Sequence, residues 1–109
     1  MFTVRNGEIY HIRGDTGTLV FQPSFETGAD VRDYTAILSV KKDIKDSDYV
    51  MQKTCKNGQF DFVAGDTDGL EAGDYIYDIE VHVGKTVQTI GPYKYHLFAD
   101  VTRGVIANG

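Results

Sequence analysis

The sequence predicts an all-β fold, an antiparallel β-sandwich of seven to eight strands. Short segments rich in Val, Ile, Leu, Phe and Tyr recur at intervals of roughly ten residues, with turn-forming residues between them and no helical period. The clearest segment is 75–83, in which Tyr, Ile and Val at the odd positions alternate with Ile, Asp, Glu and His. That two-residue period is typical of a strand with one buried face. A small closed barrel is the main alternative for such a pattern.

The residues just before this strand narrow the type of sandwich. Leu70, Gly73 and Tyr75 have the Leu-x-x-Gly-x-Tyr spacing of the corner in immunoglobulin-like domains, where the tyrosine hydroxyl bonds to backbone a few residues upstream. We expect Gly73 to supply a permissive backbone at the turn and Leu70 to cap the edge of the core. Tyr77 stands where antibody domains carry a cysteine, so packing is expected to hold the layers together without a disulfide.

Five shorter strands are expected ahead of this corner, at residues 7–13, 18–22, 34–40, 49–54 and 59–63. The first is expected at a sheet edge, and the third at the centre of a sheet because both of its faces are partly apolar. Asn57-Gly58, between the last two strands, is a strong hairpin signal, although the flanking Lys53 and Lys56 favour a longer loop. Residues 25–30 and the acidic segment 64–69 are expected to be loops.

The last strand is expected to run from Thr86 to Phe98. A two-residue turn at Gly84-Lys85 would place Ile79 opposite Ile90 and Val87 on the outward face with His82, whereas a three-residue loop would place Val83 opposite Val87. The sequence leaves both registers open. Gly91-Pro92 interrupts the strand and predicts a bulge or kink, because proline cannot donate to the ladder.

Length, charge and cysteine content limit the class of protein. The 109 residues form one domain (1–109), in which 104–109 is expected to be a flexible tail. A net charge of -5 disfavours nucleic-acid binding, and the basic cluster at 41–45 is interleaved with aspartates. The start of the sequence has no signal-peptide pattern, no segment is apolar enough to span a membrane, and the single Cys55 fits a cytoplasmic protein.

The residue types that carry catalysis are present without a catalytic pattern. The candidate nucleophiles stand in no Gly-x-Ser-x-Gly or Cys-x-x-Cys motif; they are Ser24, Ser39, Ser47 and Cys55. Either register of the last two strands separates His82 from His96 by roughly 26 Å, at about 3.3 Å per residue, so these histidines cannot share a metal. The sequence therefore predicts no enzyme and no cofactor.

Three sequence features allow a binding function. Asp66, Asp68 and Asp74 are candidate calcium ligands, although Tyr77 occupies the position where an EF-hand loop needs Glu. The aromatics of the last strand are candidates for a sugar-stacking surface; they are Tyr93, Tyr95 and Phe98. The tripeptide at 13–15 is Arg-Gly-Asp, which integrins recognise on exposed loops. A carbohydrate- or calcium-binding surface module is therefore the alternative function.

Several strings of the sequence resemble the immunoglobulin-like domains of tailed-phage proteins. They are Ile9–Gly17, Leu38–Lys42, Asn57–Phe60, Asp66–Leu70, Gly73–Ile79 and Thr89–Arg103. The most specific pieces are the Arg-Gly-Asp-Thr turn, the run from Asp66 to Ile79 and the closing Asp-Val-Thr-Arg. In particular, the chain resembles the N-terminal domain of phage baseplate upper proteins, a domain that is also found in small stand-alone prophage proteins. The similarity spans nearly the whole chain.

The resemblance implies a structural or adaptor module of a virion tail, baseplate or neck, with no catalysis and no cofactor. Such a module is assembled in the host cytoplasm without a signal peptide, and its partners are other phage structural subunits or further copies of itself. The resemblance also gives the Arg-Gly-Asp-Thr segment the role of a structural turn. Baseplate upper proteins continue into further domains, so the receptor-anchoring roles of those domains are not carried over.

Open sheet edges give such a module a means of docking. The last strand is the candidate surface, because either register leaves an outward Val87 or Ile90 unburied. Val87 and Ile90 are therefore the candidate interface residues.

Overall fold

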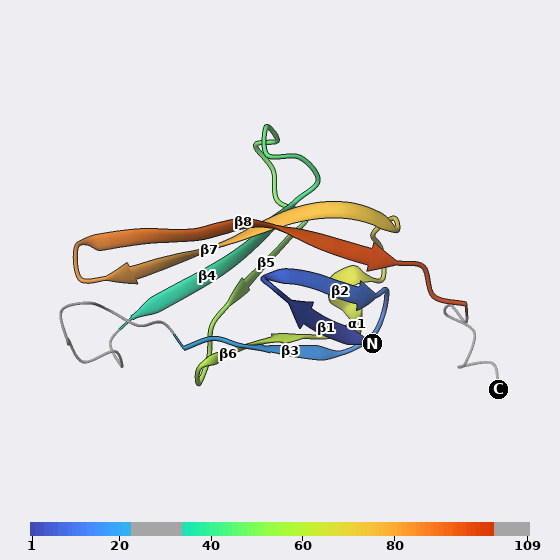
Figure 1. Cartoon of the computed structure of the whole chain (residues 1–109), viewed down its shortest axis with the longest axis horizontal. Helices are drawn as coiled ribbons and strands as arrows, with labels where there is room; N and C mark the ends of the chain where they lie inside the picture. The colour runs from blue at the N-terminus through green and yellow to red at the C-terminus, as the bar shows by residue number, and fades with distance from the viewer. Residues whose placement is uncertain (23–33, 102–109) are drawn as a thin grey trace.

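The computed structural model describes residues 1–22 and 34–101 as a two-layer β-sandwich (Figure 1). The larger layer is a six-stranded sheet with the order β1-β2-β8-β7-β4-β5, and the smaller layer pairs β3 with β6. The elements are β1 (Phe2–Arg5), β2 (Glu8–Ile12), β3 (Gly17–Val20), β4 (Thr35–Lys41), β5 (Met51–Thr54), β6 (Gln59–Phe62), α1 (Ala64–Thr67), β7 (Gly73–Val83) and β8 (Thr86–Phe98). The predicted sandwich is confirmed, and the two separate sheets exclude the closed barrel.

The strand pairing follows the immunoglobulin-like pattern. In such sandwiches the second and fifth strands share one sheet, and the third strand lies beside the last two in the other. Counted from β2, the second and fifth strands here are β3 and β6, which pair with each other. The third strand is then β4, which pairs with β7, and β7 pairs with β8. β5 adds to the outer side of β4, as the extra strand of variable-type domains does.

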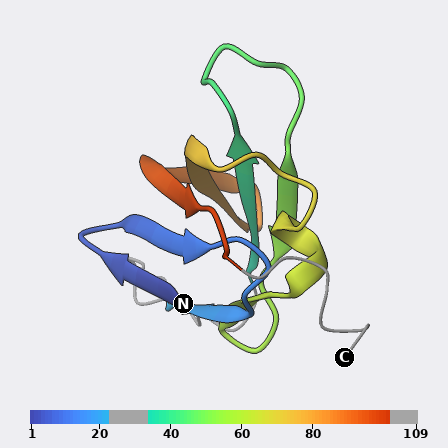
Figure 2. The same cartoon turned by 90° about the vertical axis from the view of Figure 1, so that its right-hand side faces the viewer.

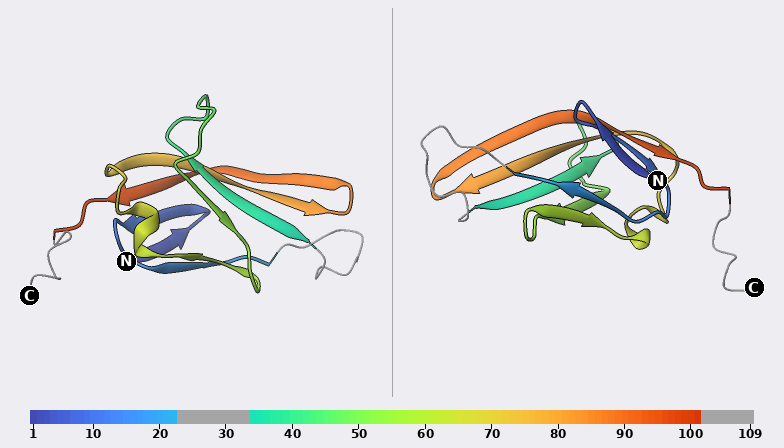
Figure 3. Two further views of the ribbon diagram at one scale, coloured as in Figure 1. Left: turned by 180° about the vertical axis from the view of Figure 1, so that it is seen from behind. Right: turned by 60° about the horizontal axis from the view of Figure 1, so that its bottom comes forward.

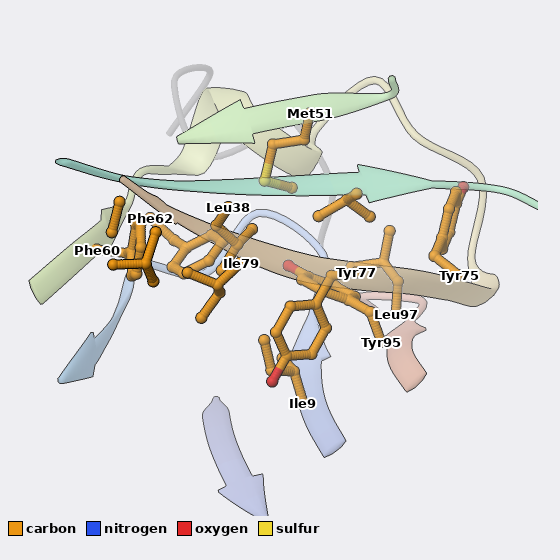
Figure 4. Packing of buried hydrophobic residues seen from close by; sticks show 13 residues of the cluster. Ile9, Leu38, Met51, Phe60, Phe62, Tyr75, Tyr77, Ile79, Tyr95 and Leu97 are labelled. Atoms are coloured by element: carbon orange, nitrogen blue, oxygen red, sulfur yellow. The ribbon is translucent and has the colours of Figure 1, made fainter. Parts of the chain in front are cut away.

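The core lies between the two layers and is centred on β7 (Figure 4). Tyr75, Tyr77, Ile79 and Val81 are buried, which confirms the predicted alternation along this strand. They pack with apolar side chains from the neighbouring strands, which are Ile9, Ala36, Leu38, Val40, Met51, Phe60, Phe62, Tyr95 and Leu97. β4 alternates in the same way between β5 and β7, so the expectation of a central third strand is also confirmed.

The start of the chain departs from the sequence prediction. The expected edge strand, β2, lies inside the sheet between β8 and an additional strand, β1. β1 and β2 form an antiparallel hairpin through Asn6 and Gly7, which both have positive φ. β2 then runs parallel to β8, with Ile9 opposite Tyr95, so the prediction of a wholly antiparallel sandwich is wrong at this pair. A parallel partner is a long-range choice that the short pattern of 7–13 does not encode.

The middle of the chain crosses between the layers. Asn57 and Gly58 do turn the chain, with φ of 54° and 75°, and Lys56 bridges to Gln59 across that turn. The strands on either side nevertheless separate, because β5 pairs with β4 and β6 pairs with β3. The acidic segment 64–69, expected to be a loop, contains the short helix α1. Four helical residues are too few to leave a helical period in the sequence.

The hairpin of β7 and β8 resolves the register that the sequence left open. Val83 lies opposite Thr86 and Ile79 opposite Ile90, so Gly84-Lys85 forms a two-residue turn and the three-residue alternative is wrong. Gly91 and Pro92 together face Asp78, which is the predicted bulge. The tip of this hairpin lies at the opposite end of the larger sheet from α1 (Figures 1 and 3).

Two sequence expectations, the loop at 25–30 and the flexible tail at 104–109, lie outside the described residues. Among the described residues, no helix is long and apolar enough to span a membrane.

Candidate interaction surface

The tyrosine corner is formed as predicted. The buried Tyr75 donates a hydrogen bond from its hydroxyl to the backbone carbonyl of Glu71 over 2.6 Å. Gly73 has a φ of 153°, which side chains disfavour, and Leu70 packs against the edge of the core. The ammonium of Lys42 lies 4.5 Å from the centroid of the Tyr75 ring. These contacts fix the turn that leads into the central strand, so the corner has a structural role.

The Arg-Gly-Asp turn is held on several sides by the fold. The Arg13 side chain pairs with Asp100 at 3.0 Å, donates to the Leu70 carbonyl at 3.1 Å, and is only 12% exposed. The Gly14 N–H donates to the hydroxyl of the buried Thr67 in α1 over 2.8 Å. A guanidinium engaged in this way is not presented for an adhesion receptor, which agrees with the reading of this segment as a structural turn.

Next to this turn lies a buried histidine that sequence reasoning missed. His11 is fully buried; its Nε2 lies 2.7 Å from the backbone carbonyl of Asp15 and its Nδ1 lies 2.5 Å from the hydroxyl of Tyr95. Because a carbonyl only accepts, Nε2 carries the proton and the Tyr95 hydroxyl donates to Nδ1. Burial, aided by the nearby amino terminus, lowers the pKa of His11 to about 4. The neutral ring therefore links β2, the turn and β8 inside the core.

The three candidate calcium ligands do not form one site. Asp66 accepts the Val63 N–H at 2.8 Å and pairs with Lys53 at 2.9 Å, whereas Asp74 lies on β7 and contacts His96. Asp68 ends α1 and is exposed. Within residues 1–22 and 34–101, no three His, Cys, Asp or Glu side chains gather in a way that could hold a metal ion.

His96 lies between two carboxylates on the outer face of the larger sheet. Its Nε2 is 2.8 Å from Glu8 on β2, and its Nδ1 is 2.9 Å from Asp74 on β7. Its ring also stacks on Tyr10, with centroids 4.8 Å apart. The hydrogen bonds to Glu8 and Asp74 raise the pKa of His96. Since β8 runs between β2 and β7, this ring joins three neighbouring strands.

The aromatic side chains of the last strand do not share one surface. Tyr95 is 1% exposed and belongs to the core, and Tyr93 packs beside Tyr77 with ring centroids 5.8 Å apart. Phe98 is 45% exposed and stacks in parallel with Tyr10 on the outer face, at a centroid distance of 6.4 Å. A surface for a planar ligand would therefore use Tyr10 and Phe98, and the predicted set of three is wrong.

The first part of β8 forms an open sheet edge. β2 pairs with β8 only from Tyr95 to Phe98, so in the described part of the chain residues 86–94 have β7 as their sole neighbour. Residues 86–89 are exposed and uncharged. The predicted docking strand is thus a sheet edge along residues 86–94 and an interior strand along its last four residues.

The two candidate interface residues have different surroundings. Val87 lies opposite His82 on the outer face and is 53% exposed. Ile90 lies opposite Ile79 and packs against the core, so it is only partly available. Of this pair, Val87 is the residue free to contact a partner.

The candidate nucleophiles that the structure describes lie on a strand, just after a strand and in a loop. Cys55 directly follows β5 and is half-buried, with its sulfur 3.8 Å from the Tyr34 hydroxyl. The Ser39 hydroxyl accepts a hydrogen bond from Gln52 at 3.1 Å, and Ser47 lies in the exposed loop 42–50. Ser24 lies outside the described residues.

No family model matches this chain, and no curated protein matches it.

Proposed function

We propose that this chain is a non-enzymatic structural or adaptor module of a bacteriophage or prophage particle, acting by packing against other subunits of the tail, baseplate or neck. Two observations support the proposal. The sequence resembles phage immunoglobulin-like domains along most of its length, and the sandwich carries an open, uncharged sheet edge at residues 86–90. The edge is the observation that carries the docking part of the proposal.

An open edge of this kind suits docking by strand addition. Proteins usually protect such edges with charge, proline or a bulge, because unpaired backbone groups attract other strands. The open edge has Lys85 just before it and the bulge at Gly91-Pro92 and Lys94 in its second part, whereas residues 86–90 contain no charge, no proline and no bulge. A partner strand would gain backbone hydrogen bonds along about five residues and would meet Val87 on the outer face.

The experiment follows incorporation of the chain into particles. Virions induced from the lysogen that encodes the chain are purified, and the chain is quantified in them by mass spectrometry for the natural sequence and for Val87→Lys. Val63→Lys is the matched control, because Val63 is also 53% exposed but lies outside β8. We expect the natural chain and the control in particles, and loss of Val87→Lys. Particles without the natural chain would refute the phage role, and equal incorporation of Val87→Lys would refute the docking edge.

A carbohydrate-binding surface is the second candidate. It rests on the parallel rings of Tyr10 and Phe98, which line a hollow of about 290 Å³ together with Arg5. Sugars commonly bind on exposed aromatic rings beside polar groups. A glycan array probed with the natural chain and with Phe98→Ala tests this, and equal or absent binding by both proteins would remove the candidate.

A further inference from the structure

A second hollow, of about 210 Å³, lies on the outer face of the larger sheet where β4 pairs with β7. Three cross-strand pairs line it; they are Ile37 with Glu80, Ser39 with Asp78, and Lys41 with Ile76. The loop 42–50, which joins β4 to β5, projects away from the smaller layer beside this face (Figures 1 and 2). The hollow thus has an apolar part and a charged part next to each other.

The loop supplies two exposed apolar side chains to the same hollow. Ile44 is 65% exposed and Tyr49 is 53% exposed, and both line the hollow. Lys41 is the basic residue of the lining, and its ammonium is already engaged: it donates to the Asp46 carbonyl over 2.7 Å and lies 5.3 Å from the Tyr49 ring centroid. A cation is therefore already accommodated at this ring.

The carboxylate of Asp78 has no such partner. Among the described residues, none donates a hydrogen bond to it, although it is only partly exposed. Burial raises the pKa of Asp78, the neighbouring Glu80 raises it further, and Lys41 opposes this. The Glu80 carboxylate lies 2.6 Å from Nε2 of His82, and the Glu80 side chain is 49% exposed. In the lining of the hollow, the carboxylates of Asp78 and Glu80 are accompanied by one ammonium, that of Lys41, and an added cation would relieve their repulsion.

We propose that this hollow binds the side chain of an arginine from a partner protein. A guanidinium is planar and weakly hydrated, donates in a fork that matches carboxylates, and stacks on aromatic rings, so it suits Asp78 and Glu80 beside the Tyr49 ring. Its aliphatic stem would cover Ile37 and Ile76. An ammonium is more compact and more strongly hydrated, and gains less from these walls. The site lies on the outer face and is lined by side chains of β4, β7 and the loop 42–50 together with Pro92 of β8, whereas strand addition would use the backbone of residues 86–90.

The test is a nuclear magnetic resonance titration of the full chain with a blocked Gly-Arg-Gly peptide. The matched probe is the same peptide with citrulline, which keeps the shape of arginine and removes its charge. We expect saturable shifts of the Ile37, Ser39 and Asp78 signals with the arginine peptide, and affinity for the citrulline peptide lower by roughly tenfold or more. Equal affinity for the two peptides, or no saturable shift, would overturn the proposal.

Protein variants test whether the carboxylate of Asp78 binds the arginine peptide. Asp78→Asn should lower the affinity for the arginine peptide by roughly tenfold, whereas Glu71→Gln, which removes one exposed charge outside the hollow, should leave it within about twofold. Equal affinities of the two variants would show that general charge attraction explains the binding, which would refute the site. Should Asp78→Asn fail to fold, as judged by its melting curve, Glu80→Gln provides the same comparison.

Discussion

The hydroxyl of Tyr75 donates to the backbone carbonyl of Glu71 over 2.6 Å, four residues upstream. This contact joins the start of β7 to the loop that follows α1. It is the hydrogen bond that the Leu-x-x-Gly-x-Tyr spacing predicts. The phenol ring itself is buried in the core (Figure 4). The bond and the ring therefore contribute to stability separately.

Removing only this hydroxyl should cost stability. Tyr75→Phe keeps the ring and deletes the bond to Glu71, so we expect the free energy of unfolding to fall by about 1 kcal/mol in urea denaturation. Tyr93→Phe is the control, because Tyr93 is partly exposed and its hydroxyl makes no hydrogen bond to another described residue. Equal stability of Tyr75→Phe and the natural chain would show that the corner bond contributes nothing.

A methyl group at Gly17 should also destabilise the protein. A Cβ built there would overlap the first side-chain atoms of Phe2, which cannot turn away because they lie next to the backbone. Phe2 packs on Phe62 with ring centroids 4.9 Å apart, so displacing it disturbs the core. We expect Gly17→Ala to cost about 1–3 kcal/mol in urea denaturation.

Gly65→Ala provides the control for this change. A Cβ at Gly65 meets no atom within 4 Å, and the residue is helical, so the substitution should be neutral or stabilise by up to about 1 kcal/mol. Equal changes in the free energy of unfolding of the two alanine variants would show that a methyl group at Gly17 does not clash with Phe2.

His11 should make the protein less stable in mild acid. The pKa of its ring is about 4 in the folded chain against an ordinary 6.5, so protons bind the unfolded chain more tightly. Its contribution is complete above pH 6.5 and is lost as the pH falls toward 4, with a total on the order of 3 kcal/mol. Urea denaturation between pH 7.5 and 4.5 measures this loss, and ring signals of His11 that titrate near pH 6.5 would contradict it.

His96 should have the opposite pH dependence. Its pKa is raised by hydrogen bonds to Glu8 and Asp74, so the folded chain binds this proton more tightly than the unfolded chain does. Its contribution is complete below pH 6.5 and declines as the pH rises through the raised value. His96→Gln should therefore destabilise the protein more at pH 6 than at pH 8.5, and an equal loss at both values would rule out the charged bridge.

The sequence by itself determined which faces of the main strands are buried and where the corner stands. Side-chain alternation along 75–83 depends on local geometry, and the Leu70, Gly73 and Tyr75 spacing acts within six residues, so both are readable from the chain. The bulge at Gly91-Pro92 is local in the same sense, because it depends on glycine and proline. The length of the turn at Gly84-Lys85 was left open by the sequence, and the pairing of Val83 with Thr86 decided it.

Only the tertiary structure decided which strands lie side by side. The parallel pairing of β2 with β8, the burial of His11 and the cross-strand pair of Ser39 with Asp78 each join residues from distant parts of the chain. A two-residue period shows that one face of a strand is buried, but it does not show which strands pair with it or which layer packs on it. The open edge at Val87 follows from the same cause, since β2 is long enough to pair only with the last four residues of β8.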